Sequence, residues 1–173
     1  GTLNENIRSN VHLVNNITIT KDNTRFIFST LLSKINPDKQ WYIEKDVSDF
    51  QFIRYKGYRF SIDRFNELHE DCLRFITSEL HRNNTGKTIV ATHHVPTFFN
   101  YPEQYKGSDL NEAFAVELFD LIEANGPHYW IYGHHHNNAP EFKIGNTAML
   151  TNQLGYVKYN EQQGFKTNAI IEI

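Results

Sequence analysis

Two short apolar segments, each followed closely by histidine, constrain the fold of this chain more than any other feature. The first is Lys87–Thr92, and His93 comes directly after it. The second spans residues 128–132; it runs into Gly133 and then into three consecutive histidines at positions 134–136. Continuous apolar runs of this length are typical of strands that are buried on both faces of a parallel sheet. Glycine after the second run lets the backbone turn sharply where the strand ends.

The residues between these two segments predict a crossover helix. Asp109 and Glu112 have the spacing of a helix-capping pair, and Gly126-Pro127 is a stop signal. Between them, apolar residues recur at helical spacing: Leu110, Phe114, Leu118, Leu121 and Ile122. A crossover helix makes its two strands parallel, so their carboxyl ends lie on one edge of the sheet. We therefore expect His93 to meet the histidines at 134–136, at the edge where open α/β sheets bind their ligands.

The rest of the chain predicts a mixed α/β domain. Segments 11–15, 17–20 and 25–30 are expected to form an antiparallel meander, with Asn15-Asn16 as a hairpin turn. Residues 62–82 have the period of an amphipathic helix. Further strands are expected at 141–144, 147–151 and 169–173, with Gly145-Asn146 as a turn between the first two. Segment 41–58 has no clean period, and irregular structure covering the edge of the core is favoured over a lid or partner-binding loop.

Composition sets limits on the class of protein. At 173 residues, with 39% hydrophobic and 21% charged residues, the chain is expected to form one globular domain. A net charge of −3 does not indicate binding to nucleic acid, and there is no apolar run of the roughly 20 residues that cross a bilayer. The single cysteine, Cys72, is expected to be a reduced core residue of the helix, which favours a cytoplasmic location.

The histidines after the two strands suggest a metal site. Neutral imidazole is the commonest metal ligand, and a turn brings His134 and His136 toward one point. The alternative for this stretch alone is a solvated polar loop, but its expected convergence with His93 favours the metal site. His69 and His81 lie in or near the long helix and are interpreted as satisfied or surface histidines.

The pattern Thr92-His93-His94-Val95-Pro96 followed by Gly133-His134-His135-His136 resembles the calcineurin-like metallophosphoesterases. Segment 152–156, Asn-Gln-Leu-Gly-Tyr, is similar to the Asn-x-x-Gly-Tyr ending of that family. The resemblance implies a phosphoester hydrolase with a pair of divalent metal ions, such as manganese, iron or zinc. It also implies a fold class: α/β, the C-terminal portion of a four-layer αββα sandwich with a mixed sheet and outer helices.

The same resemblance implies roles for individual residues. His93, His134 and His136 would be metal ligands, and His135 would occupy the variable position of the motif. His94, Asn137 and Asn152 would lie near the substrate or behind the ligands. The substrate class would be phosphoesters, with specificity set by loops such as 41–58 and 98–107.

Three motifs of the family do not occur in the sequence: Asp-x-His, Gly-Asp-x-x-Asp, and Gly-Asn-His followed by Asp or Glu. They supply the carboxylates, the Asn ligand and the proton donor of the family. We therefore expect residues 1–173 to form a single partial domain, the C-terminal half of the family's domain. Three imidazoles without carboxylates cannot hold two metal ions, so we expect an inactive chain that binds one ion weakly or none.

The partial domain leads to one further expectation and two alternatives. A sheet face that the missing half would cover is apolar, and we expect a homo-oligomer to bury it. One alternative function is a non-catalytic interaction module that binds through the aromatic segments 41–58 and 98–105. The other is a domain that binds a single zinc ion through three histidines.

Overall fold

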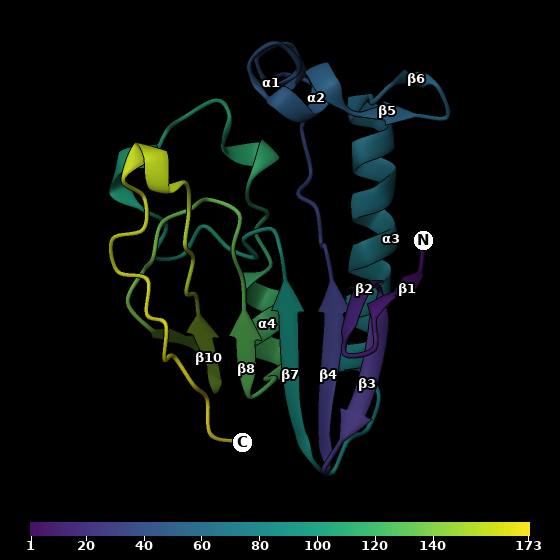
Figure 1. The fold of residues 1–173 in the computed structure, drawn as a ribbon, viewed down its shortest axis with the longest axis vertical. Helices are drawn as coiled ribbons and strands as arrows, with labels where there is room; N and C mark the ends of the chain where they lie inside the picture. Colours follow the sequence, from purple (N-terminus) through teal and green to yellow (C-terminus); the bar gives the residue numbers. More distant parts are fainter.

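The computed structural model describes residues 1–173, and its central element is a six-stranded mixed sheet in the order β3-β4-β7-β8-β10-β9 (Figure 1). The four inner strands run parallel to one another. They are β4 (Thr24–Ser29), β7 (Lys87–Thr92), β8 (Tyr129–Ile131) and β10 (Thr147–Leu150). The edge strands β3 (Ile17–Lys21) and β9 (Phe142–Ile144) are antiparallel to their neighbours. The expected mixed α/β fold is confirmed.

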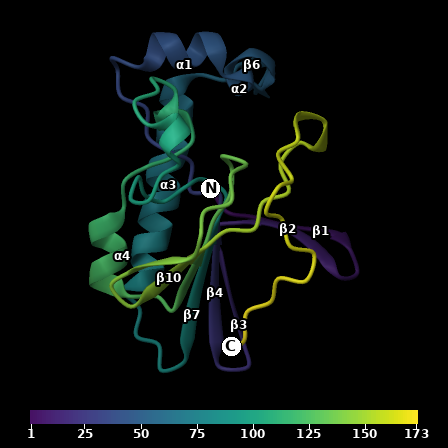
Figure 2. The same ribbon diagram turned by 90° about the vertical axis from the view of Figure 1, so that its left-hand side faces the viewer.

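One face of the sheet is covered by helices. Ile27, Val90, Trp130 and Met149 are register partners across four strands, and each is at most 1% exposed. This row packs into the main core together with residues of helices α3 (Ile62–Leu80) and α4 (Phe119–Asn125), which lie on the same side of the sheet (Figure 2). Alternation along each strand places these four side chains on one face, so the core follows directly from the register.

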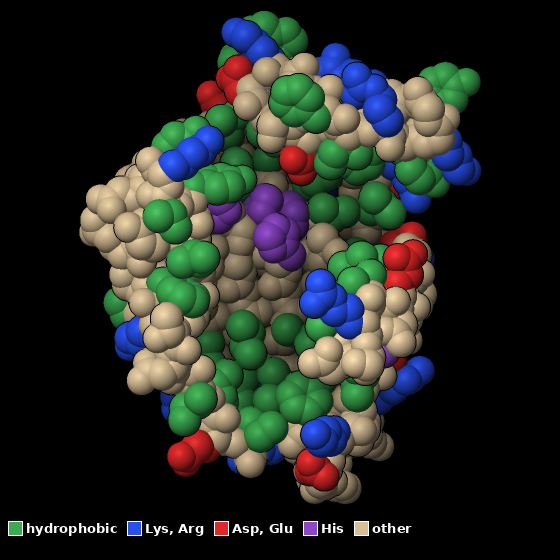
Figure 3. Space-filling view, viewed as in Figure 1, with side chains coloured by type: hydrophobic (Ala, Val, Ile, Leu, Met, Phe, Trp, Pro, Cys, Tyr) green, Lys and Arg blue, Asp and Glu red, His purple; other side chains and the backbone are tan.

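The opposite face of the sheet is open. The neighbouring row, Phe28, Ala91, Ile131 and Leu150, is only half-buried in all four strands. Figure 3 shows hydrophobic side chains within a broad hollow on this side of the molecule. A two-stranded sheet of β1 (Leu3–Arg8) and β2 (Val11–Asn15) projects from the same side (Figure 2).

The long helix α3 confirms the predicted helix at 62–82. Ser61 caps it by accepting a hydrogen bond from the Arg64 N–H. Its buried face includes Phe65, Cys72 and Ile76, so the cysteine lies in the core, as expected. None of the helices is both long and apolar enough to cross a membrane.

The expected hairpin between segments 11–15 and 17–20 is wrong. The first segment, β2, pairs with β1, and the second, β3, pairs with β4 through the turn at Asp22-Asn23. Asn16 separates them with a left-handed backbone (φ 53°), and its side chain accepts a hydrogen bond from Ser29. The chain therefore changes sheets at Asn16 instead of folding back on itself.

The helix expected from Asp109 to Gly126 forms only in its second half. Residues 111–113 make one 3₁₀ turn, η2 (Asn111–Ala113), and α4 begins at Phe119. Between them the backbone forms a parallel bridge, Val95 to Ala115, whose hydrogen bonds replace those of a helix. Gly126 ends α4 in the left-handed conformation (φ 50°), so the predicted stop is confirmed.

Two other expectations about local structure are wrong. Segment 41–58 is regular: it contains α1 (Gln40–Asp46), α2 (Ser48–Phe52) and a small hairpin of β5 (Arg54–Tyr55) and β6 (Tyr58–Arg59). Ile43 and Phe50 are fully buried in a second core cluster and hold these elements in place. Residues 169–173 form no strand, because no neighbouring strand pairs with them and all five are exposed. The hairpin at Gly145-Asn146 is confirmed, with strands β9 and β10.

Candidate functional site

The site lies where the parallel strands β7 and β8 end. His93 follows β7 directly, and His134 follows β8 after Tyr132 and Gly133. The Nε2 atom of His93 and the Nδ1 atom of His134 are 2.9 Å apart, although the residues are 41 positions apart in the sequence. Figure 3 shows a cluster of histidine side chains at the upper end of the open hollow. The expected convergence of these two histidines is confirmed.

The backbone around the histidines is bent in an unusual way. Gly133 does not have a positive φ; its N–H donates to the carbonyl of His93 (3.1 Å), so the two strand ends are tied together there. His134 and His136 themselves adopt positive φ angles, of 76° and 53°. Few residues other than glycine take this conformation, with Asn, Asp and His the most frequent exceptions. Strained backbone of this kind recurs at active sites and ligand clamps. The turn expected at Gly133 is thus made by the histidines that follow it.

His94 lies behind the pair. It is buried, and its ring stacks on that of His134 with centroids 4.1 Å apart. Its ring Nδ1 atom is 3.2 Å from the hydroxyl of Ser33, and its backbone N–H donates a hydrogen bond to the carbonyl of Thr30. His94 therefore connects the end of β4 to the two histidine-bearing strand ends.

The segment after β4 is also conformationally strained. Leu31 and Leu32 both have positive φ, which costs roughly 1–2 kcal/mol for each residue. Leu31 is completely buried, and the carbonyl of Leu32 pairs with Nδ1 of His69 at 2.9 Å. His69 is 1% exposed, so it is the satisfied histidine that was expected.

His136 and His135 point to different partners. The Nδ1 atom of His136 is 3.0 Å from Glu161, which also accepts the N–H of Tyr156. The side-chain oxygen of Gln153 accepts a hydrogen bond from the backbone N–H of His136, and its side-chain nitrogen lies 2.9 Å from Nδ1 of His135. No hydrogen bond joins His136 to His93 or His134, although its charged form lowers the pKa of both, so only two of the three expected ligands are paired directly.

The two expected asparagines lie apart from the histidine pair. The side chain of Asn137 borders a cavity beside His136. The side-chain amide of Asn152 instead exchanges two hydrogen bonds of 2.9 Å with the backbone of Lys166, which secures the C-terminal tail. Their roles toward a substrate stay predictions.

Burial keeps the imidazoles neutral. Together with the neighbouring histidines, it lowers the pKa of His134 and that of His135 to about 4. Burial also lowers the pKa of His94 well below its ordinary value and lowers that of His93. The carboxylate of Asp49 in α2 has the opposite effect and raises the pKa of His93. At neutral pH these histidines therefore present lone pairs, as metal ligands must.

The residues of the chain do not fit a pair of metal ions. No group of three or more His, Cys, Asp or Glu side chains is arranged to hold a metal ion. The 2.9 Å between nitrogens of His93 and His134 is a hydrogen-bond distance. Two nitrogens on one tetrahedral zinc, each roughly 2.0–2.1 Å from it, would lie roughly 3.3–3.4 Å apart, so a small shift of the rings would bring both onto one ion. The histidine pair thus fits as part of the coordination shell of a single ion.

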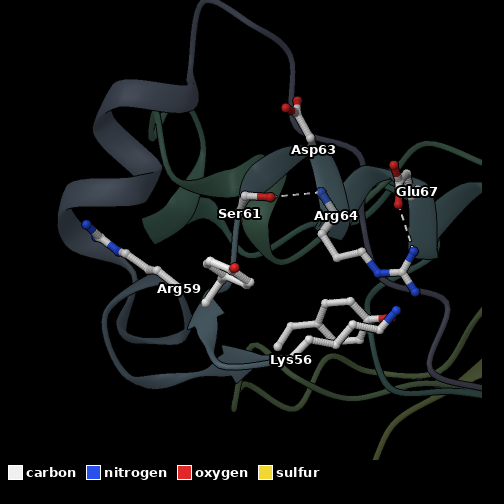
Figure 4. A pocket seen from close by; sticks show the side chains of 8 residues that line it. Lys56, Arg59, Ser61, Asp63, Arg64 and Glu67 are labelled. Carbon is white, nitrogen blue, oxygen red and sulfur yellow. Dashed lines mark hydrogen bonds and ion pairs between the residues drawn. The ribbon is translucent and has the colours of Figure 1, made fainter.

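The arginines of β6 and of the first turn of α3 are hydrogen-bonded within the protein. Arg59 donates to the carbonyl of Phe50, and Arg64 pairs with Glu67 at 2.7 Å. Both arginines line a cavity of about 330 Å³, together with Lys56 and Asp63 (Figure 4). Asp63 and Glu67 offset two of the three positive charges of this lining, which argues against a phosphate site here.

Sequence reasoning missed the residues that orient the histidines. Ser33, Gln153 and Glu161 each contact a histidine of the 93–94 or 134–136 segments. Ser33 and Glu161 come from loops that carry no motif of their own. Gln153 lies within the Asn-x-x-Gly-Tyr segment, so its position was the one available signal.

Comparison with known proteins shows the fold. No protein-family model matches the sequence, and no curated protein matches it. The structure superposes on the crystal structure of phosphopantetheinyl hydrolase (PptH) from Mycobacterium tuberculosis with a TM-score of 0.58 and 11% sequence identity. The match covers 86% of this chain but only 56% of the hydrolase chain. The chain therefore shares the fold of just over half of a hydrolase.

Proposed function

We propose that this chain is the histidine-bearing part of a metal-dependent phosphohydrolase of the calcineurin-like metallophosphoesterase type. The observation that carries the proposal is the contact between His93 and His134 at the ends of adjacent parallel strands. The fold shared with a phosphopantetheinyl hydrolase supports it. In such an enzyme, divalent metal ions polarise the phosphoester and lower the pKa of an attacking water.

In this proposal His93 and His134 bind one divalent ion, and His136 is the third candidate ligand. Glu161 holds Nδ1 of His136 and leaves Nε2 available, an arrangement common among metal-binding histidines. Two ions need more ligands than these imidazoles supply, and anionic oxygen ligands to balance the charge. Those carboxylates would come from polypeptide other than the 173 residues described, so the chain alone is expected to be inactive.

Metal titration of the purified chain tests the proposal. Isothermal titration calorimetry with Zn²⁺ and Mn²⁺ near pH 7.5 is expected to give at most one ion per chain. His134→Ala should abolish this binding, while the exposed His81→Ala should leave it unchanged. Binding that survives both His93→Ala and His134→Ala, in variants with unchanged circular dichroism, would contradict the assignment.

Phosphatase and phosphodiesterase assays test the expected inactivity. The metal-loaded chain should not turn over p-nitrophenyl phosphate or bis-p-nitrophenyl phosphate above the rate of the free ion. Robust turnover that is lost in His134→Ala would show that the chain carries a complete site. The proposal that its set of metal ligands is incomplete would then be wrong.

Exposed aromatic residues favour an interaction module as the second candidate function. Trp41, Phe52 and Tyr58 are 65%, 81% and 78% exposed on the α1 to β6 region. Aromatic side chains this open are enriched at protein interfaces. In this alternative, the triple variant Trp41→Ala, Phe52→Ala, Tyr58→Ala loses partner binding while metal binding is unchanged.

A further inference from the structure

A second cavity lies directly beside His136. It has a volume of about 320 Å³ and is formed by three segments that are far apart in the sequence. They are residues 104–105, residues 136–138 and residues between 160 and 163. Its size is at the lower end of the roughly 300–1,000 Å³ of ligand sites, which suits a group as large as a single sugar.

Carboxamides dominate the lining of this cavity, and three of them have no partner in the protein. Asn138 is used structurally, since it exchanges two hydrogen bonds with the backbone of Gln153. The side chains of Gln104, Asn137 and Gln163, in contrast, make no hydrogen bond within the protein. Each free carboxamide offers two N–H donors and a carbonyl acceptor.

Charge argues against an anionic occupant. No Lys or Arg lines the cavity, and its single acidic residue is Glu161. A phosphate placed here would face a carboxylate without a cation to offset it. A purely apolar occupant fits no better: Tyr105 is the single hydrophobic residue of the lining, and each amide left unpaired on burial would cost about 1–3 kcal/mol. The chemistry that remains is an uncharged group that both donates and accepts hydrogen bonds.

We infer that this cavity binds the uncharged organic group of the phosphoester, a group that bears hydroxyls or amides. The inference rests on the proposed function, because it places the phosphate at the histidine ligands and the organic group in the cavity that His136 borders. Gln104, Asn137 and Gln163 then determine specificity. A polyol and an amide share the required chemistry, and matched probes separate them.

Binding can be measured without catalysis. Side-chain amide signals in ¹H–¹⁵N spectra of the metal-free chain are followed during titration with glucose 6-phosphate, with O-phospho-N-acetylethanolamine and with phenyl phosphate. One of the first two is expected to shift the signals of Gln104, Asn137 and Gln163 and to bind about tenfold more tightly than phenyl phosphate. Preference for the first identifies a polyol, and preference for the second an amide. Equal binding of all three, or shifts confined to other residues, overturns the inference.

Variants provide the matched control. Gln104→Leu combined with Gln163→Leu should weaken binding of the preferred probe about tenfold, whereas the exposed Asn168→Leu, outside the cavity, should have no effect. Unchanged binding in the double variant overturns the inference. Both residues are exposed, and circular dichroism is used to check that the variants fold.

Phosphate-free probes separate this inference from the proposed function. Methyl α-glucopyranoside and N-acetylethanolamine do not depend on a metal or on His134. If one of them shifts the three amide signals while Zn²⁺ binding survives His93→Ala and His134→Ala, the cavity assignment stands and the phosphohydrolase proposal fails. If Zn²⁺ binds through His134 but neither phosphate-free probe nor either ester shifts these signals, the cavity assignment fails alone.

Discussion

Nδ1 of His136 lies 3.0 Å from Oε2 of Glu161, which brings the histidine-rich turn against a loop 25 residues further along the chain. Both side chains are about one-third exposed, so the pair is partly screened by solvent. The same carboxylate oxygen accepts the N–H of Tyr156 at 2.6 Å. Glu161 therefore holds two segments at once, its own loop and the turn of His136.

Glu161→Ala is expected to loosen the 156–161 loop. The variant removes the acceptor of the Tyr156 N–H and the partner of His136, and we expect a loss of about 1 kcal/mol in the free energy of unfolding. Hydrogen exchange of the Tyr156 amide should become much faster. Glu141→Ala, an exposed position outside this contact, is the control, and equal exchange in both variants would contradict the role of Glu161.

The histidine cluster predicts a loss of stability in acid. The pKa of His134 and that of His135 are lowered to about 4 in the folded state, whereas the unfolded chain titrates near 6.5. Between these values the unfolded state binds more protons, so the free energy of unfolding falls as the pH falls from about 6.5 to about 4. Urea unfolding at several pH values measures this. The double variant His134→Gln, His135→Gln should have a shallower pH dependence, and exposed His12→Gln should not; identical slopes would contradict the assignment.

The fully buried row of the sheet should carry much of the stability. Ile27 is 0% exposed in the middle of β4, and Ile27→Ala is expected to cost about 2–4 kcal/mol, because it leaves a cavity against the helices. Ile19 of β3 is 47% exposed, so Ile19→Ala should cost less than about 1 kcal/mol. Urea midpoints at unchanged m-value measure both, and equal losses would show that the assigned core face is wrong.

The open face of the sheet leads us to propose self-association. Phe28 and Ile131 lie in the half-buried row on that face, and neither is charged. Burying such a row against a second copy removes apolar surface from water. Light scattering is expected to give a dimer or larger species, and Phe28→Lys with Ile131→Lys should give a monomer. Ile170→Lys, 84% exposed outside the sheet, is the control. A clean monomer of the unmodified chain would contradict the proposal.

The sequence predicted best the elements whose pattern is local. The amphipathic period of α3, the stop at Gly126 and the turn at Gly145-Asn146 are all confirmed. So is the pairing of β7 with β8, because a crossover connection leaves one favoured arrangement. These elements are enough to bring His93 to His134.

The failures come from contacts between distant residues. Nothing near Asn16 in the sequence reveals that its side chain binds Ser29, and this contact decides which sheet each flanking strand joins. Ala115 lies in a segment whose apolar spacing predicted a helix, but its backbone pairs with that of Val95 instead. Glu161 gave no local signal of its contact with His136, since its position depends on how the loop returns to the sheet.

The long connections between the paired strands have a consequence for the cooperativity of folding. Strands β4 and β7 pair although the chain between them contains all of α3, and β7 and β8 pair although the chain between them contains residues 101–125. His93, His94 and His134 are thus held by strand ends that meet only when these long connections have closed. The histidine cluster is not a local motif that survives partial unfolding. Its geometry forms and disappears with the sheet, so it reports on global folding of the domain.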